Sequence, residues 1–346
     1  MTVARSKIVD VAVTPWYHVI SKTVRGALLL GEGDIDRKQW IEDRIELLTK
    51  CFAISTAGFA ILDSHLHLLV RLEPERVDRW SDKEVVRRWF MIYPPRGAGR
   101  RPLAVTRELI RQKSTDKKFL KKVRCRLANL GWFMKCLKEP LARLANREDG
   151  TTGAFWQSRY KSIAILDVEA LVATCAYIDL NVVAAGLERL AEDSPHTSIR
   201  ARVDHCRRKG RIGDLQAARN SSFAGCEATR GLEDDSLWLC PIEDRRQRDA
   251  NARAGMLDGF SLGSYLLLVD WTSRLARPGK ARVSAEIAAL LDRLGSGVEN
   301  WRATMERLFT ASRLTGVAFA FQRERLRDAA RHRGCHHLAN LSGCPA

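Results

Sequence analysis

Two histidines separated by one residue are the first feature of this sequence that could do chemistry. His65 and His67 lie in an apolar run typical of a strand, so both imidazoles project from one face while Leu66 and Leu68 project from the other into the core. Two converging imidazoles can hold one divalent metal ion. A solvated strand face is the simpler interpretation, but two polar rings on a central strand are costly unless something uses them.

Tyr177 and Asn181 are the candidate partners of this histidine pair. They are four residues apart on a predicted helix and therefore share a face. An ordinary buried tyrosine and an asparagine near a helix end would explain both residues. The functional interpretation makes Tyr177 a nucleophile and Asn181 an oxygen ligand beside His65 and His67, a mixed donor set that suits Mg²⁺ or Mn²⁺. Attack by tyrosine on a phosphodiester leaves a covalent phosphotyrosine, which a free hydroxyl can later reverse.

The chain is strongly basic, which is a second indication of function. Its 346 residues include 58 Lys and Arg against 41 Asp and Glu, a formal net charge of +17. The excess is concentrated between Arg96 and Arg126, where the acidic residues are Glu108 and Asp116. This segment is either a solvated basic helix or a surface that binds nucleic-acid phosphates in a salt-dependent way. The predicted phosphate-binding residues are Arg111, Lys117, Lys118, Lys121 and Lys122.

The composition argues against several other classes of protein. With 45% hydrophobic and 29% charged residues, the sequence is that of a globular chain. The longest apolar run, from Cys51 to Leu62, is too short to cross a bilayer, and no export signal is recognisable, so we expect a cytoplasmic protein without a membrane partner. The nine cysteines are scattered without a CxxC pair, which argues against a disulfide framework or a zinc ribbon.

The elements that must position these residues alternate along the chain. The periodicity predicts strands over 16–23, 53–62, 65–72 and 155–166, and helices over 36–49, 128–146 and 168–183. Asp167 is the expected N-cap of the last helix. A long insertion occupies about residues 75–126. Without it the order is β-α-β-β-α-β, so we expect an α+β protein with a ferredoxin-like βαββαβ core and a basic helical insertion.

The chain divides into two predicted regions. Residues 10–200 would form the catalytic domain, and residues 201–346 a mainly helical C-terminal region of unknown role. The apolar-periodic stretches in the second region are Phe260–Leu268, Val283–Leu294 and Trp301–Phe309. Either helical packing or selection of a DNA site would account for them.

Four further residues on predicted strands are weaker candidates. Trp156, Arg159 and Lys161 could stack on bases and bind phosphates, although Trp156 could equally fill the core. His18 lies on the first predicted strand. We expect it to be a satisfied strand histidine and not a metal ligand.

Three motifs together resemble the HUH-superfamily single-tyrosine transposases, and specifically the REP-associated tyrosine transposases. His65-Leu66-His67 is similar to the His-hydrophobic-His signature. Residues 155–162, FWQSRYKS, are similar to the family's Phe-Trp-Gln-x-Arg-Tyr block. Residues 177–187 are similar to its Tyr-Ile-x-x-Asn-Pro-Val-x-Ala-Gly-Leu block, with Val182 in place of the proline. The long insertion and the C-terminal region both exceed the minimal family domain.

This resemblance covers about residues 10–200 and implies a bacterial, metal-dependent single-strand DNA transesterase. It implies Tyr177 as the nucleophile, His65, His67 and Asn181 as ligands of Mg²⁺ or Mn²⁺, and a 5′-phosphotyrosine intermediate at hairpin or palindromic repeats. The implied partner is single-stranded or hairpin DNA. A homodimer stays open, because members of the superfamily can pair the tyrosine and the histidines across two subunits. The alternatives are a non-catalytic nucleic-acid-binding regulator derived from such an enzyme, and a replication or conjugation nickase.

Overall fold

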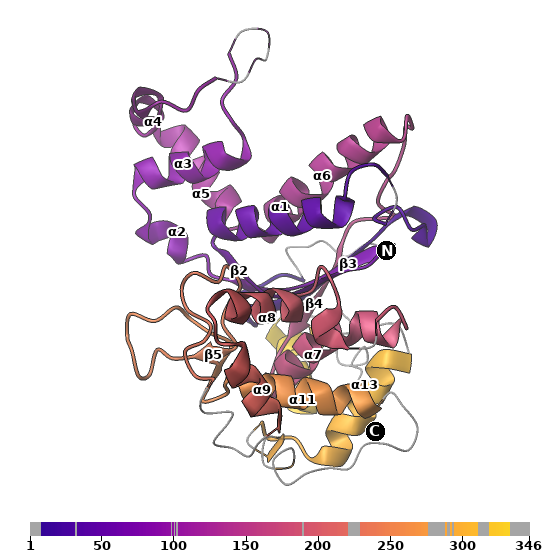
Figure 1. Ribbon diagram of the computed structural model, residues 1–346. Coiled ribbons are helices and arrows are strands. Elements are labelled where there is room, and N and C mark those ends of the chain that lie inside the picture. Colours follow the sequence, from indigo (N-terminus) through magenta and orange to yellow (C-terminus); the bar gives the residue numbers. More distant parts are fainter. Residues whose placement is uncertain are drawn as a thin grey trace.

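The computed structural model describes residues 8–31, 33–97, 99, 101, 103–188, 190–220, 229–275, 288, 291–292, 294–310 and 318–332. Over these residues the protein is α+β, with a five-stranded mixed sheet between two layers of helices (Figure 1). The order in the sheet is β2-β3-β1-β4-β7. The strands are β1 (Trp16–Lys22), β2 (Ile54–Ile61), β3 (His65–Leu72), β4 (Lys161–Ile165) and β7 (Ala318–Phe319), and a separate pair is formed by β5 (Glu243–Asp244) and β6 (Leu257–Asp258).

The register of the sheet decides which side chains meet. Strand β1 pairs antiparallel with β3 and with β4, β2 pairs antiparallel with β3, and β7 pairs parallel with β4. Ile20 lies opposite His67, and Lys22 lies opposite His65. On β3, Leu66 and Leu68 enter the core under one helical layer, so the predicted division of the two faces of this strand is confirmed.

Two helices, α1 (Arg37–Cys51) and α6 (Leu130–Glu148), cover the face of the sheet that receives Leu66 and Leu68. The Asp36 side chain accepts a hydrogen bond from Gln39 N at 2.9 Å and so begins α1, close to where the sequence predicted. The Asn129 side chain begins α6 in the same way. In Figure 1 these helices lie above the sheet.

The segment between β3 and α6 is helical, as predicted, and forms an arm at the upper left of Figure 1. Three helices of the arm begin at a side chain that caps the first turn, and these caps are Ser81, Thr106 and Asp116. Arg124 ties its parts together, since its guanidinium donates to Trp80 O and to Asp82. The helices of the arm are α2 (Arg76–Arg79), α3 (Asp82–Ile92), α4 (Arg107–Lys113) and α5 (Lys117–Leu127).

The opposite face of the sheet is covered by α7 (Val168–Ala184) and by helices that follow it. Asp167 accepts from Ala170 N at 2.8 Å, so the predicted N-cap of α7 is confirmed. Almost every side chain of α7 is buried, because the sheet lies on one side of it and C-terminal helices lie on the other. These later helices are α8 (Ser198–Arg208), α9 (Ile212–Asn220), α11 (Leu262–Leu275) and α13 (Val298–Thr310), whereas Leu326 of α14 (Arg323–His332) is buried in the cluster of the first face.

The residues after 200 share a hydrophobic cluster with the first region. Leu69 of β3, Ile178 of α7, Leu268 of α11 and Trp301 of α13 are all buried in it. The division at residue 200 stays a prediction, but over the described ranges its two sides pack against each other. None of the helices described here is long and apolar enough to cross a membrane.

One predicted strand begins later in the structure than expected, and one predicted helix falls largely outside the described residues. The strand predicted over 155–166 is wrong in its first half, because β4 begins only at Lys161. Before it, Thr23 and Trp156 form an isolated antiparallel bridge, in which Val24 N donates to Phe155 O and Gln157 N donates to Lys22 O, so pairing with β1 is interrupted before Lys161. The helix predicted over Val283–Leu294 falls largely outside the described residues.

Glu169, on the first turn of α7, provides a test of this packing. Burial raises the pKa of its carboxyl group from 4.5 to about 7, and the charge of Asp167 adds to the shift. Because the folded-state pKa lies above the unfolded value, stability is expected to fall as pH rises from about 4.5 to about 7. Glu169→Gln should therefore raise Tm by about 2–4 °C at pH 8 and leave it unchanged near pH 4.

Thermal unfolding of the full chain at the two pH values measures this effect. The control is Glu299→Gln, because the Glu299 side chain is 81% exposed and its charge has no burial to overcome. Equal Tm changes at both pH values for Glu169→Gln would contradict the expected titration.

Candidate active site

A cavity of about 510 Å³ lies where the ends of β1, β3 and β4 meet the last turns of α7. Its lining includes His65, His67, Tyr177 and Asn181. Strand alternation turns the two histidines toward α7, and helical spacing turns Tyr177 and Asn181 toward the sheet. The structure thus brings together the four residues that the sequence singled out for catalysis and metal binding.

The four side chains are close enough to contact one bound substrate group. The ring centroids of His65 and His67 are 5.0 Å apart, and the Tyr177 ring is 5.7 Å from that of His67. The side chain of Asn181 lines the same cavity and acts on the pKa of both His65 and Tyr177. The amide therefore links the predicted nucleophile to the histidine pair.

His18 is a fifth member of the group. It is fully buried, and its Nε2 lies 2.9 Å from Nδ1 of His67, with the two rings stacked at a centroid distance of 5.1 Å. The expectation of a satisfied strand histidine holds for Nε2 alone, because Nδ1 is buried without a hydrogen-bond partner among the described residues, and the contact with His67 was not expected. The register could have revealed it, because His18 shares a strand face with Ile20, which pairs with His67.

Burial sets the charge state of these groups. It lowers the pKa of His65 to about 4, with a further contribution from Lys22, and it lowers that of His67 well below the usual value. Both rings are neutral at neutral pH and keep a lone pair for ligation. Burial also raises the pKa of Tyr177, partly offset by the hydrogen bond to Asn181, so the phenol keeps its proton until a positive charge favours its loss.

The geometry of the ring nitrogens fits a divalent metal ion. Nδ1 of His67 is engaged by His18, and its Nε2 is buried without a hydrogen-bond partner among the described residues. Nδ1 of His65 lies 3.0 Å from Ser64 Oγ, so Nε2 is the nitrogen left to ligate. Within the described ranges no three His, Cys, Asp or Glu side chains are grouped for a metal; the Asn181 amide, which lines the same cavity, is an oxygen donor beside the two rings.

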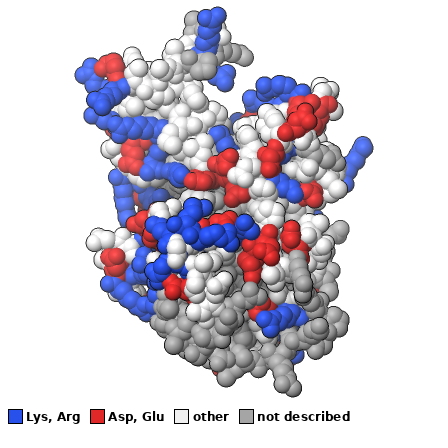
Figure 2. All heavy atoms as spheres, in the orientation of Figure 1, with Lys and Arg blue, Asp and Glu red and all other residues white. Residues whose placement is uncertain are grey.

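Basic residues border the cavity. Lys22, Arg159 and Lys161 line it and are exposed, so two of the three predicted DNA contacts on the 155–166 segment lie at the site. Trp156 does not line it, because its Nε1 donates to Lys138 O at 3.0 Å and Lys138 Nζ covers its ring. The basic residues predicted on the insertion, Arg111, Lys117, Lys118, Lys121 and Lys122, are exposed on α4 and α5, where blue side chains gather at the upper left of Figure 2.

The C-terminal region also contributes to the cavity. Phe309, near the end of α13, lines it, and its ring centroid is 6.0 Å from that of Tyr177. Sequence reasoning missed this residue, since a single phenylalanine in an apolar helix carries no functional signal. The contact means that the extension helps to enclose the predicted nucleophile.

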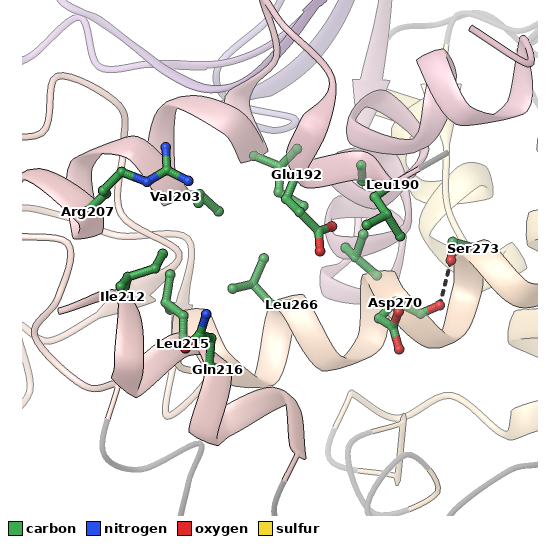
Figure 3. Close-up of a pocket in the computed structure, with 13 residues that line it drawn as sticks. Leu190, Glu192, Val203, Arg207, Ile212, Leu215, Gln216, Leu266, Asp270 and Ser273 are labelled. Atoms are coloured by element: carbon green, nitrogen blue, oxygen red, sulfur yellow. Dashed lines mark hydrogen bonds between the residues drawn. The ribbon is translucent and has the colours of Figure 1, made fainter. Parts of the chain in front are cut away.

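A different hollow lies between α8, α9 and α11 (Figure 3). It has a volume of about 200 Å³, and Ile212, Leu215 and Leu266 point into it. Its lining includes no histidine, cysteine or tyrosine. Its polar lining includes Glu192, Asp270 and Ser273, and the Ser273 hydroxyl donates to the backbone oxygen of Asp270.

Comparisons with known proteins add little to this geometry. No protein-family model and no curated protein matches the sequence. A solved structure of a REP-associated tyrosine transposase bound to a REP hairpin aligns over 55% of this chain and 78% of its own, at 14% identity and a TM-score of 0.29. A likeness of this degree does not define a family, so the chemistry of the cavity rests on its own residues.

Proposed function

We propose that this protein is a metal-dependent single-strand DNA transesterase that cleaves and rejoins strands through a 5′-phosphotyrosine on Tyr177. The observation that carries the proposal is the placement of the Tyr177 phenol against His65 and His67 in one basic cavity. The order β2-β3-β1-β4, with each neighbouring pair antiparallel, supports a ferredoxin-like core beneath the site. The substrate class is single-stranded or hairpin DNA.

Each residue has a role in this proposal. His65, His67 and Asn181 would hold Mg²⁺ or Mn²⁺, which supplies positive charge that makes phosphorus more electrophilic and stabilises a departing oxygen. The Tyr177 oxygen bonds to phosphorus as the bond from phosphorus to the 3′-oxygen breaks, and the phenolic proton passes through solvent to the departing oxygen, which leaves as a 3′-hydroxyl. Lys22 and Lys161 lie at the rim, where ammonium groups favour the bound phosphate. Phe309 covers the Tyr177 ring and helps to keep water from the phosphotyrosine.

The test is formation of a covalent adduct. The full-length protein is incubated with a labelled pool of hairpin-bearing single-stranded oligonucleotides and Mg²⁺ or Mn²⁺, and products are separated on a denaturing gel. A DNA–protein adduct that a chelator prevents, and that maps to Tyr177, is the expected result. Tight binding across the pool without an adduct in either metal would contradict the proposal and favour a nucleic-acid-binding regulator.

His18 is expected to position His67 for metal binding. Its bond to Nδ1 fixes the tautomer and orientation of the His67 ring, and loss of such outer partners typically weakens metal binding about 10- to 100-fold. His18→Phe keeps a flat aromatic side chain but removes the bond, so calorimetric titration with Mn²⁺ should give a Kd higher by that factor. His332→Phe, which removes a half-exposed imidazole outside the cavity, is the control. An unchanged Kd in a folded His18→Phe variant would contradict this role.

A further inference from the structure

A larger cavity, of about 720 Å³, lies away from the catalytic residues. One wall comes from the end of β3, α2 and α3, and the other from the loop over residues 235–254. Basic residues outnumber acidic ones in its lining. The basic residues are Lys50, Arg71, Arg76, Arg79, Arg88, Arg246 and Arg253, and the acidic ones are Glu73, Glu75 and Asp235.

Strand β3 connects this cavity to the catalytic one. Arg71 shares the strand and the strand face of His65 and His67, and it lies about 20 Å from His65 at the strand rise per residue. The two cavities have no lining residue in common. A strand of DNA that reaches beyond the catalytic cavity is long enough to meet both.

Two arginines on the first wall, Arg71 and Arg76, are held by neighbouring side chains. Glu73, which is 7% exposed, accepts hydrogen bonds from Arg76 Nη1 at 2.8 Å and from Ser55 Oγ at 2.5 Å. The guanidinium of Arg71 lies over the Trp16 ring at 5.6 Å. Among the described residues, Nε and Nη2 of Arg76 have no hydrogen-bond partner, and a guanidinium already fixed by Glu73 loses little entropy on binding a ligand.

The second wall presents further donors toward the same space. Arg246 is held by Asp244 through Nε at 3.0 Å and Nη2 at 2.6 Å, which leaves Nη1 for a ligand. Arg253 donates from Nη2 to Leu239 O at 2.9 Å. Across from them, Arg79 is exposed and forms no ion pair with any residue that the structure describes. Guanidinium forks that converge from two walls match the oxygens of phosphate groups.

We propose that this cavity binds backbone phosphates of the DNA strand at a second site, outside the catalytic cavity. The proposal rests on the proposed function for its choice of ligand. Its walls come from the insertion arm and from the loop beyond residue 200, which lie next to each other at the left of Figure 1, and basic side chains follow the same edge in Figure 2. The two segments that exceed the minimal domain thus meet to form one phosphate-binding surface.

The test compares strand binding by the full-length protein and two matched double variants. Arg79→Ala with Arg246→Ala removes one guanidinium from each wall without exposing the buried Glu73. The control, Arg143→Ala with Arg331→Ala, removes two arginines that are 69% and 75% exposed elsewhere. Fluorescence anisotropy with a labelled hairpin oligonucleotide is measured over about 50–200 mM salt. We expect the first variant to bind about 10-fold more weakly, with a salt slope smaller by about 2.

Each outcome of this test is informative. Equal affinity and slope in both double variants would overturn the second site. Binding of ATP that is lost in the Arg79 and Arg246 variant, with strand binding unchanged, would assign the cavity to a free nucleotide and would also overturn it. Adduct formation is followed in the same samples. Weaker strand binding by the variant, in a protein that never forms an adduct, would support the phosphate site while the proposed transesterase fails.

Discussion

Tyr177→Phe is expected to abolish the covalent DNA adduct while DNA affinity stays within about two-fold of the wild-type value. The phenylalanine keeps the ring that packs against His67 and Phe309, so the cavity retains its shape. It removes the oxygen that would bond to phosphorus, and no covalent step can proceed without a nucleophile. The measurement is the adduct yield on a denaturing gel, with an expected loss of at least about 1,000-fold, the scale seen when a catalytic nucleophile is removed.

Tyr93→Phe is the matched control for this change. Tyr93 is 37% exposed, its hydroxyl contacts Cys136 Sγ at 3.4 Å, and it lies on the insertion arm away from the cavity. Its variant should form the adduct at the wild-type rate. An adduct that persists in Tyr177→Phe would assign the nucleophile to another residue.

Elements with local signals could be predicted from the sequence. Apolar alternation predicted the observed bounds of β3, and Asp167 predicted the start of α7 as its side-chain cap. The i, i+4 spacing placed Tyr177 and Asn181 on one face, and the cavity lining agrees with that placement. These features depend on residues only a few positions apart, which is why a sequence can reveal them.

The parts that could not be predicted depend on contacts between distant residues. The bond between His18 and His67 requires the register of β1 against β3, which no single strand encodes. Phe309 reaches Tyr177 only because α13 packs against α7. The two residues of β7 are too few for a periodic pattern, although they extend the sheet beside β4. The composition of the arginine-lined cavity likewise depends on two segments far apart in the chain.

A buried ion pair beneath β2 joins the residues after 200 to the sheet. Arg202 of α8 is fully buried, with its Nε 2.8 Å from Oε1 of Glu233. Its Nη2 donates to Ala57 O and to Cys240 O, each at 2.8 Å. The guanidinium therefore joins the sheet to two segments that follow residue 200, at a place where an unpaired charge is costly.

Arg202→Met is expected to lower the free energy of unfolding by about 3–5 kcal/mol, because it leaves the Glu233 carboxylate buried without its partner. Glu233→Gln in the same chain should recover part of the loss, since it removes the stranded charge. Urea unfolding of the full chain measures both changes, and a single variant as stable as the wild type would contradict the argument. Neither residue lines the catalytic cavity, so the protein that remains folded at low temperature should still form the Tyr177 adduct. Loss of the adduct from folded Arg202→Met would instead mean that the packing of α8 sets the geometry of the site.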